Sequence, residues 1–275
     1  MNQLIQTLFS LRNKTAVITG GTGVLGSSMS KALSEAGANV AIIGRRIEVG
    51  QKLADEIQTG GGKAIAVQAD VLQKGELIKA KEKIISSFGT IDILINGAGG
   101  NMPGATIAPD KSFFDLDTKA FQQVVDLNLL GTVIPSQIFG EVMALKKEGV
   151  IINISSMSAF RPITRVVGYS AAKAAVRNFT QWLAIEMAKK YGAGIRVNAI
   201  SPGFFITEQN RTLLTNPDGT LTARGASVIQ NTPFARFGEP DELNGTLLWL
   251  CSDASKFVSG VDVPVDGGFN AFCGV

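Results

Sequence analysis

Short runs of apolar residues recur along most of the chain, and stretches with helical spacing of apolar positions separate them. Most of these runs are continuously apolar instead of alternating with polar residues, which is typical of strands covered on both faces. They predict strands over residues 14–19, 39–43, 63–67, 91–95, 149–154, 194–199 and 261–265. The stretches between them predict helices near residues 24–36, 47–59, 73–87, 116–146, 169–190 and 240–252.

Regular alternation of strands and helices predicts an α/β fold, a single doubly wound parallel sheet of about seven strands with helices on both faces. The 275 residues are enough for one large domain, and no linker or shift in composition divides them, so we expect one domain over residues 1–275. The returns between elements carry glycines that are typical of helix C-caps and turns, namely Gly37, Gly60 to Gly62, Gly89 and Gly149.

Two segments depart from this alternation. Residues 1–13 have leucines and a phenylalanine at helical spacing, which predicts an N-terminal extension with a short helix packed on the body instead of a signal peptide. Residues 202–239 carry scattered Pro, Gly and Asn and no strand pattern. A segment of that length in a compact domain is usually a lid or a substrate-binding element.

The charge and cysteine content of the chain indicate which kinds of binding partner and cellular compartment to expect. The net charge is +3 and the 26 basic residues form no dense run, which argues against nucleic-acid and membrane-surface partners. No apolar run reaches the ~18 residues that cross a bilayer. The two cysteines, Cys251 and Cys273, fit no metal or redox spacing, so we expect no metal site, reduced thiols and a cytoplasmic protein.

The ends of the predicted strands carry the candidate chemistry, because ligands of an open parallel sheet bind beyond the carboxyl ends of its strands. Gly21, Gly23 and Gly26 follow the first strand and open a helix. Glycines there let the backbone approach a pyrophosphate, which the helix N-terminus stabilises, so a dinucleotide site is favoured over a bare turn. The other strands end in Gly44-Arg45-Arg46, Asp70-Val71, Asn96-Gly97-Ala98-Gly99, Ser155-Ser156 and Pro202-Gly203.

The end of the second strand indicates which dinucleotide is bound. An NAD site usually offers an acid there for the ribose hydroxyls, whereas this chain offers Arg45 and Arg46. Arginine is suited to a 2′-phosphate because it is always charged and binds in a bidentate manner. The pattern favours NADP(H) over NAD(H), and two solvated arginines at a turn remain the alternative.

Tyr169 and Lys173 stand four residues apart, so they share one face of a helix, in a chain with no histidine. A lysine charge about 4 Å from a phenol is worth ~4 kcal/mol at an effective dielectric of ~20. That would lower the phenol pKa by ~3 units from ~10, toward neutrality, and an oxidised nicotinamide would act in the same direction. The pair is therefore a candidate general acid/base, with a packed tyrosine beside a surface lysine as the alternative.

Two further polar residues fall near this pair. Ser156 follows a strand, where its hydroxyl could bind a substrate oxygen. Asn128 shares a predicted helix face with Phe121, Val125 and Thr132. A buried asparagine must be satisfied, and it is either a core hydrogen-bonding residue or the holder of a water that relays protons through Lys173.

The segments TGGTGVLG, NGAG, RVNAISPG and VDGG, together with Asp70, Asn128, Ser156 and the Tyr169-x-x-x-Lys173 motif, resemble the short-chain dehydrogenase/reductase family. The likeness runs in order from about residue 14 to 268. It implies a single Rossmann domain with Tyr169 as catalytic acid/base, Lys173 on the nicotinamide ribose, Ser156 on the substrate oxygen and Asn128 completing a tetrad.

The resemblance also implies a set of coenzyme contacts, with Asp70 at the adenine. The predicted contacts are Gly20, Thr22, Gly23, Val24, Leu25, Gly26, Gly44, Arg45, Arg46, Asp70, Val71, Asn96, Gly97, Ala98, Tyr169, Lys173, Pro202, Gly203, Phe205 and Thr207. Two positions depart from the family pattern, because Val24 stands where a glycine is usual and Gly97 replaces the second asparagine of N-N-A-G. Neither change removes an acid, a base or a donor, so we expect an active enzyme.

A narrower likeness, in the stretches after Ser156, Ser201 and Asn231, is to the D-mannonate oxidoreductase (fructuronate reductase) branch. It implies a sugar-acid substrate, although that branch usually takes NAD. Loop residues with amide, hydroxyl or guanidinium groups are the candidate substrate contacts, namely Asn101, Ser158, Arg161, Arg165, Gln209, Asn210 and Arg211. The family likeness further implies a homotetramer that packs the helices of Asn128 and Tyr169 against a neighbour.

Other functions remain open at this point. The substrate could be another carbonyl compound, such as a 3-oxoacyl group, a keto-gluconate or a polyol. An epimerase that uses bound NAD transiently would normally carry an additional substrate domain, for which 275 residues leave no room. A catalytically silent nucleotide sensor would lack a member of the tetrad, and none is missing.

Overall fold

A parallel sheet of seven strands runs through the middle of the molecule in the computed structural model, which describes residues 3–208 and 210–274. The strand order is β3-β2-β1-β4-β5-β6-β7. The strands are β1 (Thr15–Thr19), β2 (Asn39–Gly44), β3 (Lys63–Gln68), β4 (Ile93–Asn96), β5 (Gly149–Ile154), β6 (Ile195–Pro202) and β7 (Asp262–Val265). Each lies within a residue or a few residues of its predicted range.

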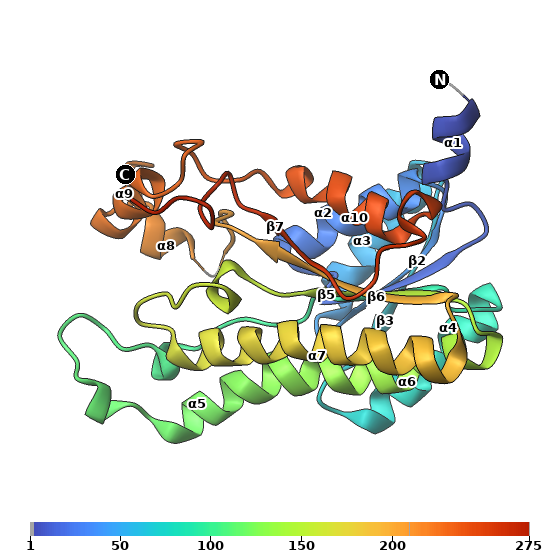
Figure 1. The fold of residues 1–275 in the computed structure, drawn as a ribbon, viewed down its shortest axis with the longest axis horizontal. Coiled ribbons are helices and arrows are strands. Elements are labelled where there is room, and N and C mark those ends of the chain that lie inside the picture. The colour runs from blue at the N-terminus through green and yellow to red at the C-terminus, as the bar shows by residue number, and fades with distance from the viewer. Residues whose placement is uncertain (1–2, 209, 275) are drawn as a thin grey trace.

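Helices cover both faces of the sheet (Figure 1). On one face lie α2 (Val24–Glu35), α3 (Ile47–Thr59) and α10 (Asn244–Cys251), and on the other lie α4 (Lys74–Phe88), α6 (Gly131–Lys146) and α7 (Val167–Tyr191). Successive strand residues point to opposite faces, so Ile18 joins the core under α2 while Val17 joins the core with Phe139 of α6. The predicted α/β fold is confirmed.

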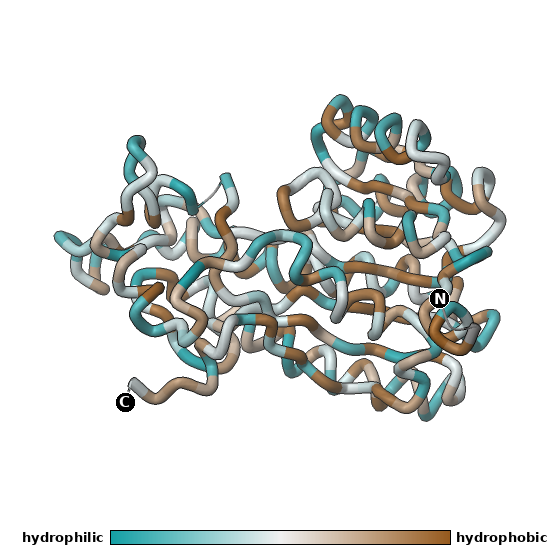
Figure 2. The backbone as a smooth tube through the Cα atoms, turned by 90° about the horizontal axis from the view of Figure 1, so that it is seen from above, coloured by the Kyte–Doolittle hydropathy of each residue, from teal (hydrophilic) through white to brown (hydrophobic). Residues whose placement is uncertain are grey.

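The apolar character of the strands follows from this double cover. In Figure 2 the extended segments across the middle of the view are largely hydrophobic. All five residues of β1 are buried, and so are all eight of β6.

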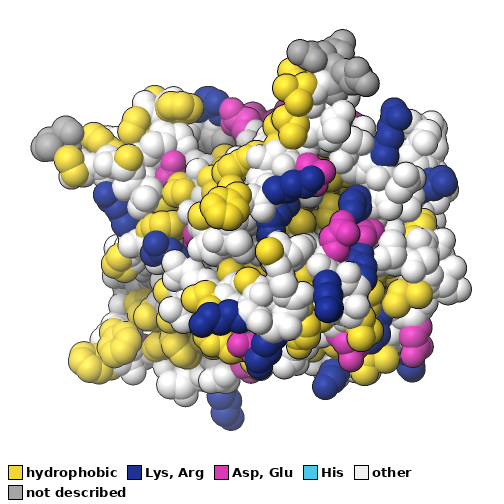
Figure 3. Space-filling view, turned by 45° about the vertical axis from the view of Figure 1, so that its right-hand side comes forward, with side chains coloured by type: hydrophobic (Ala, Val, Ile, Leu, Met, Phe, Trp, Pro, Cys, Tyr) yellow, Lys and Arg dark blue, Asp and Glu magenta, His cyan; other side chains and the backbone are white. Residues whose placement is uncertain are grey.

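On the face shown in Figure 3, Lys and Arg side chains are scattered and several lie beside Asp or Glu. Within the described residues, no helix is both long and apolar enough to cross a membrane.

The strand order reverses direction at β1, which pairs with β2 on one side and with β4 on the other. Thr19 at the end of β1 is in register with Asn96 at the end of β4. Ligands of doubly wound sheets bind at such a switch point, because the loops leaving the two strands diverge to opposite faces. The segments after β1 and β4 therefore frame the expected site.

The long helix predicted over residues 116–146 is divided, which corrects the prediction. It consists of α5 (Thr118–Val125), a π-helical turn (Asp126–Leu130) and α6. The Asn128 side chain donates a 2.8 Å hydrogen bond to the carbonyl of Val124, one turn back. Pro135 lies inside α6 and has no amide hydrogen to donate, which weakens the helix just after this turn.

The return after α6 and the N-terminal extension add detail. Gly149 begins β5, as the predicted strand over residues 149–154 requires, and Lys147 caps α6 in the left-handed conformation, with φ of 58°. The predicted N-terminal helix forms as α1 (Gln3–Phe9), but Leu4 and Ile5 are 62% and 48% exposed. The buried Leu11 anchors the extension to the body instead.

Pro202 ends β6, and the segment 203–239 that follows it is called the lid. Its described residues contain two short helices, α8 (Arg211–Leu214) and α9 (Ala223–Gln230), and no further strand of the sheet.

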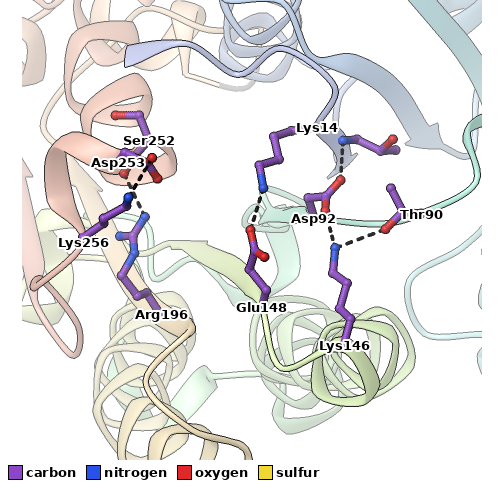
Figure 4. A network of polar contacts seen from close by, with 10 residues as sticks. Lys14, Thr90, Asp92, Lys146, Glu148, Arg196, Ser252, Asp253 and Lys256 are labelled. Carbon is purple, nitrogen blue, oxygen red and sulfur yellow. Dashed lines mark hydrogen bonds and ion pairs between the residues drawn. The ribbon is translucent and has the colours of Figure 1, made fainter. Parts of the chain in front are cut away.

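The amino ends of the strands, on the side of the sheet opposite the predicted site, carry a polar network (Figure 4). Lys14 pairs with Glu148 at 2.6 Å, and Lys146 pairs with Asp92. These ion pairs are remote from the carboxyl ends of the strands, so we assign them a structural role and no role in the site.

Candidate active site

A cleft of about 560 Å³ opens at the carboxyl ends of β1 to β4, and we call it the glycine-loop cleft. Fourteen of the residues predicted to contact a coenzyme line it, namely Gly20, Thr22, Gly23, Val24, Leu25, Gly26, Gly44, Arg45, Arg46, Asp70, Val71, Gly97, Ala98 and Thr207. They come from four different strand ends and from the 202–239 segment, which only the tertiary structure brings together.

The N-terminus of α2 opens into this cleft. Gly23 is its N-cap and provides no side-chain hydrogen bond, so the first backbone N–H groups of the helix have no capping partner. A Cβ atom at Gly26 would lie 2.3 Å from the Gly20 carbonyl oxygen, so only glycine permits this turn. Free N–H groups at a helix N-terminus bind phosphate, and the cleft therefore fits the pyrophosphate of a dinucleotide. Val24 is accommodated as the first residue of α2.

The arginines after β2 stand at one end of the glycine-loop cleft. Arg45 and Arg46 are exposed, and the Arg46 guanidinium donates a 3.4 Å hydrogen bond to the Thr22 carbonyl. Asp70 lines the same cleft, where its carboxylate accepts a 2.9 Å hydrogen bond from the Leu72 amide. No acidic residue directly follows β2, as the sequence shows.

A second cavity of about 300 Å³ adjoins the first, and we call it the tyrosine cavity. The two share Leu25, Gly97, Gly99 and Thr207 as lining residues, so they lie side by side. The other predicted catalytic and coenzyme-binding residues in the tyrosine cavity are Ser156, Tyr169, Lys173, Pro202, Gly203 and Phe205. A molecule lying in the glycine-loop cleft can therefore reach the tyrosine.

Lys173 is 4% exposed and its ammonium group donates a 2.7 Å hydrogen bond to the Ile154 carbonyl. Its Nζ atom lies 5.6 Å from the centroid of the Tyr169 ring. Burial lowers the pKa of Lys173 to about 8, and the buried Asp262 of β7 acts in the opposite direction. The lysine is thus charged at neutral pH but close to titration.

The predicted lowering of the Tyr169 pKa is wrong when only the protein's own groups act on the phenol. Burial raises the pKa of the phenol above its ordinary value, and the hydrogen bond with Ser156 lowers it by less. Lys173 is held by Ile154, so its charge does not offset the loss of solvation. Bringing the phenol close to neutrality requires a further positive charge in the cavity.

Asn128 is completely buried and holds the loop that follows β4. Its amide group donates to the Gly100 carbonyl at 2.7 Å, and its carbonyl accepts from the Gly100 amide at 3.1 Å. A Cβ atom at Gly99 would lie 2.6 Å from the Asn128 Oδ1 atom and 3.2 Å from the Lys173 Nζ atom. The absence of a side chain at Gly99 keeps Asn128 and Lys173 close to each other.

Two predicted contacts lie outside both spaces. The Asn96 side chain points into the core, where it donates to Ser136 and to Asn153, both at 2.9 Å. Asn96 therefore connects β4 with β5 and α6 and does not line the cleft, which corrects the prediction. Ser158 is buried, and its backbone amide donates to the Ser156 hydroxyl at 3.2 Å.

The other predicted substrate contacts divide into two groups. Asn101 and Asn210 line the tyrosine cavity, where the Asn210 side chain also holds the Thr207 amide at 2.8 Å. Arg165 and the exposed Arg211 line neither the glycine-loop cleft nor the tyrosine cavity. Arg161 lines a third cavity, and Gln209 lies outside the described residues.

Sequence reasoning missed Arg224 of α9, which lines the tyrosine cavity together with Leu213 and Leu214 of α8. Its position depends on how residues 202–239 fold over the sheet, and that segment has no regular pattern from which to predict it. The described residues hold no group of three or more His, Cys, Asp or Glu side chains placed to bind a metal ion.

The chain matches a protein-family model and is similar to a known oxidoreductase. A family model described as short chain dehydrogenase matches residues 14–218. An uncharacterized oxidoreductase of Bacillus subtilis (strain 168), UxuB, is 50% identical and covers 97% of this chain and 98% of its own length.

Two solved structures extend the comparison. That of a proposed D-mannonate oxidoreductase of Haemophilus influenzae with bound NAD has a TM-score of 0.91 and 46% identity, covering 97% of this chain and 98% of its own. That of a gluconate 5-dehydrogenase of Burkholderia cenocepacia J2315 with NADP and tartrate has a TM-score of 0.86 and 31% identity, covering 97% and 99%.

Proposed function

Because the chain belongs to the short chain dehydrogenase family and is therefore an NAD(P)-dependent oxidoreductase, we propose that its substrate is a sugar acid of the D-mannonate/D-fructuronate type. The observation that supports hydride transfer in this chain is that the glycine-loop cleft adjoins the tyrosine cavity and shares four lining residues with it. A coenzyme in the cleft and a carbonyl compound beside Tyr169 would be in contact.

Tyr169 and Ser156 are the proposed catalytic residues at the substrate oxygen. In reduction, the Tyr169 hydroxyl gives its proton to the carbonyl oxygen while the Ser156 hydroxyl donates a hydrogen bond to it. When bound, the coenzyme supplies or accepts the hydride, and its oxidised ring brings a positive charge into the cavity. In oxidation, that charge favours ionised Tyr169, which takes the proton of the alcohol.

Lys173 and Asn128 complete the proposed site. The Lys173 ammonium is buried beside the ring of Tyr169, so it stabilises the ionised phenol and can also bind a ribose hydroxyl. Asn128 positions Gly99 and Gly100 and so fixes the floor between the cleft and the cavity. We place it as a positioning residue, because all its polar atoms are occupied by backbone partners.

The sugar-acid substrate is supported by the likeness to a proposed D-mannonate oxidoreductase and to a gluconate 5-dehydrogenase. We also propose a preference for NADP(H), since Arg45 and Arg46 border the cleft and no acid directly follows β2. The Haemophilus structure holds NAD and the Burkholderia structure holds NADP, so the experiment compares both coenzymes.

We further propose a homotetramer in the cytoplasm. Trp182 and Ile185 of α7 are 56% and 59% exposed, and Leu145 of α6 is 82% exposed. Large apolar side chains on neighbouring helices suit contact with another copy of the chain. Cys251 is a buried thiol, as suits a reducing compartment.

The test is reduction of D-fructuronate and 5-keto-D-gluconate, with NADH and NADPH in parallel, beside acyl and steroid ketones. We expect steady consumption of coenzyme with a keto sugar acid. In Y169F, kcat should fall by at least ~100-fold, because the proton donor is lost. Y191F replaces the other tyrosine, at the far end of α7, and should retain activity.

Three outcomes would contradict the proposal at different levels. Inert keto sugar acids beside reactive acyl or steroid ketones would reject the substrate class and leave the oxidoreductase intact. Interconversion of substrates without net consumption of coenzyme would indicate an epimerase. Undiminished turnover by Y169F would reject the proposed chemistry.

A further inference from the structure

Arg224 stands between two cavities. It lines the tyrosine cavity and also a third cavity of about 250 Å³ that contains Arg161, which we call the arginine cavity. Ile163 and Phe204 line both spaces as well, so the two adjoin. The Arg224 guanidinium donates two hydrogen bonds to Thr164, each 3.3 Å long and therefore weak. The guanidinium group can thus form stronger hydrogen bonds with a ligand.

Within the described residues, the charge of Arg224 has no ion-pair partner. No ion pair within residues 3–208 and 210–274 includes Arg224, Arg161 or Arg165. Among the described residues that line the tyrosine and arginine cavities there is no Asp or Glu. Burial and the nearby Arg165 both lower the pKa of Arg224. A half-buried cation without an anion favours the binding of one.

The arginine cavity suits the polar end of a small acid. Arg161 closes one side, where its guanidinium donates a 2.6 Å hydrogen bond to the carbonyl of Phe272 in the C-terminal segment. Ser227 and Asn231 of the lid add a hydroxyl and an amide, while Phe269 and Phe272 supply apolar walls. Two guanidinium groups with hydroxyl and amide partners match a carboxylate that carries neighbouring hydroxyl groups.

We propose that Arg224 is the carboxylate-binding residue of the substrate site, and that the arginine cavity receives the acid end of the substrate beyond it. This inference rests on the proposed function, since it assigns the carbonyl end of the same molecule to Tyr169 and Ser156. It makes α9 the element that distinguishes an acid from a neutral polyol or ketose. A substrate with its carboxylate several carbons from the reacting carbon would span both cavities.

Binding is tested first with tartrate and threitol, which share a four-carbon diol chain and differ in charge. Isothermal titration of the coenzyme-saturated protein should show that tartrate binds the wild type and that threitol does not. R224Q should bind tartrate roughly 10- to 100-fold more weakly. R224K keeps the charge without the bidentate geometry and should be intermediate. R211Q removes an exposed arginine of the same lid and should match the wild type.

Kinetics supply the second readout. With a keto sugar acid, R224Q should raise KM by a similar factor with a smaller change in kcat, whereas KM for a neutral ketose such as L-sorbose should not rise.

Equal tartrate binding by R224Q and wild type, or no binding by wild type, overturns the subsite. If tartrate binding depends on Arg224 while no keto sugar acid is reduced, the subsite stands and the proposed substrate falls. If R224Q reduces the acid with unchanged KM, the substrate stands and the subsite falls.

Discussion

At the scale of single residues, the charge of Lys173 is set by two opposed effects. Burial lowers its pKa to about 8, and the carboxylate of Asp262 opposes that shift. The side chain of Asp262 is itself 3% exposed, and its Oδ2 atom lies 3.9 Å from the Arg177 Nε atom. Ser201 donates a 2.7 Å hydrogen bond to its Oδ1 atom, and Ser155 also lowers the pKa of this carboxyl group. Lys173 and Arg177 of α7, with the two serines, are thus the groups that face this carboxylate.

This arrangement predicts a specific pH dependence. Lys173 is charged below its pKa, so activity that needs its charge is lost as the pH rises through about 8. D262N removes a negative charge, which lowers the pKa of Lys173 further. The alkaline limb of the pH profile of kcat/KM should therefore move to lower pH, by roughly half a unit to one unit for a partly screened pair.

The control for that experiment is S201A, which removes a hydrogen bond from the same buried network and leaves the charge of Asp262 in place. Its thermal stability should fall, while its alkaline limb should stay where the wild type has it. Superimposable profiles for D262N and wild type would show that Asp262 does not act on Lys173.

At the scale of elements, the break between α5 and α6 gives the site its geometry. The π-helical turn Asp126–Leu130 directs the side chain of Asn128 back toward Val124 and across to Gly100. Such turns are rare within helices, and they are frequent at functional sites. The loop after β4 and the start of α6 are thereby held as one unit, with Gly99 at the point of closest approach.

A substitution at Gly99 tests this unit. In G99A the added Cβ atom would lie 2.6 Å from the Asn128 Oδ1 atom, so the loop or the asparagine must shift. We expect a loss of about 1–3 kcal/mol in the free energy of unfolding, as for overpacking. A displacement near 1 Å at the site should also reduce kcat/KM by roughly 100-fold.

G75A is the matched control, because a Cβ atom there meets nothing within 4 Å and the position lies in α4. Alanine is the better helix former by about 0.5–1 kcal/mol, so this variant should be as stable as the wild type or more so. Equal stability and activity of G99A and wild type would contradict the role assigned to Gly99 and Asn128.

At the scale of the whole molecule, the glycine-loop cleft joins segments that are distant in the sequence. Gly20 and Asp70 from the first half of the chain meet Thr207 from the lid along one wall. A coenzyme bound there contacts four strand ends and the 202–239 segment at once. Its binding energy therefore adds to the stability of the complete fold.

Thermal unfolding measures this coupling. A coenzyme at 100 times its Kd stabilises the folded state by about 2.7 kcal/mol, and each kcal/mol raises the Tm of a domain of this size by roughly 2–4 °C. We expect a rise of about 5 °C or more with NADPH and a smaller rise with NADH at equal concentration. A larger rise with NADH would contradict the proposed preference for NADP(H), and no rise with either would contradict the coenzyme site.

Local patterns in the sequence determined the elements and most of the site. The strands are continuously apolar because they are covered on both faces, and that property is visible in each segment alone. The spacing of Tyr169 and Lys173 determined that they share a helix face. The glycines after β1 and the arginines after β2 are likewise local signals, and Gly23, Gly26, Arg45 and Arg46 line the glycine-loop cleft.

Only the tertiary structure decided which side chains enter the shared space and what their surroundings do to them. Asn96 turns into the core, Arg211 does not line the tyrosine cavity, and Arg224 does. The direction of the pKa shift of Tyr169 also reversed, because desolvation depends on every neighbour and not on the residue four positions away. Periodicity is a property of adjacent residues, whereas burial and charge compensation are sums over groups that the chain brings together only when it folds.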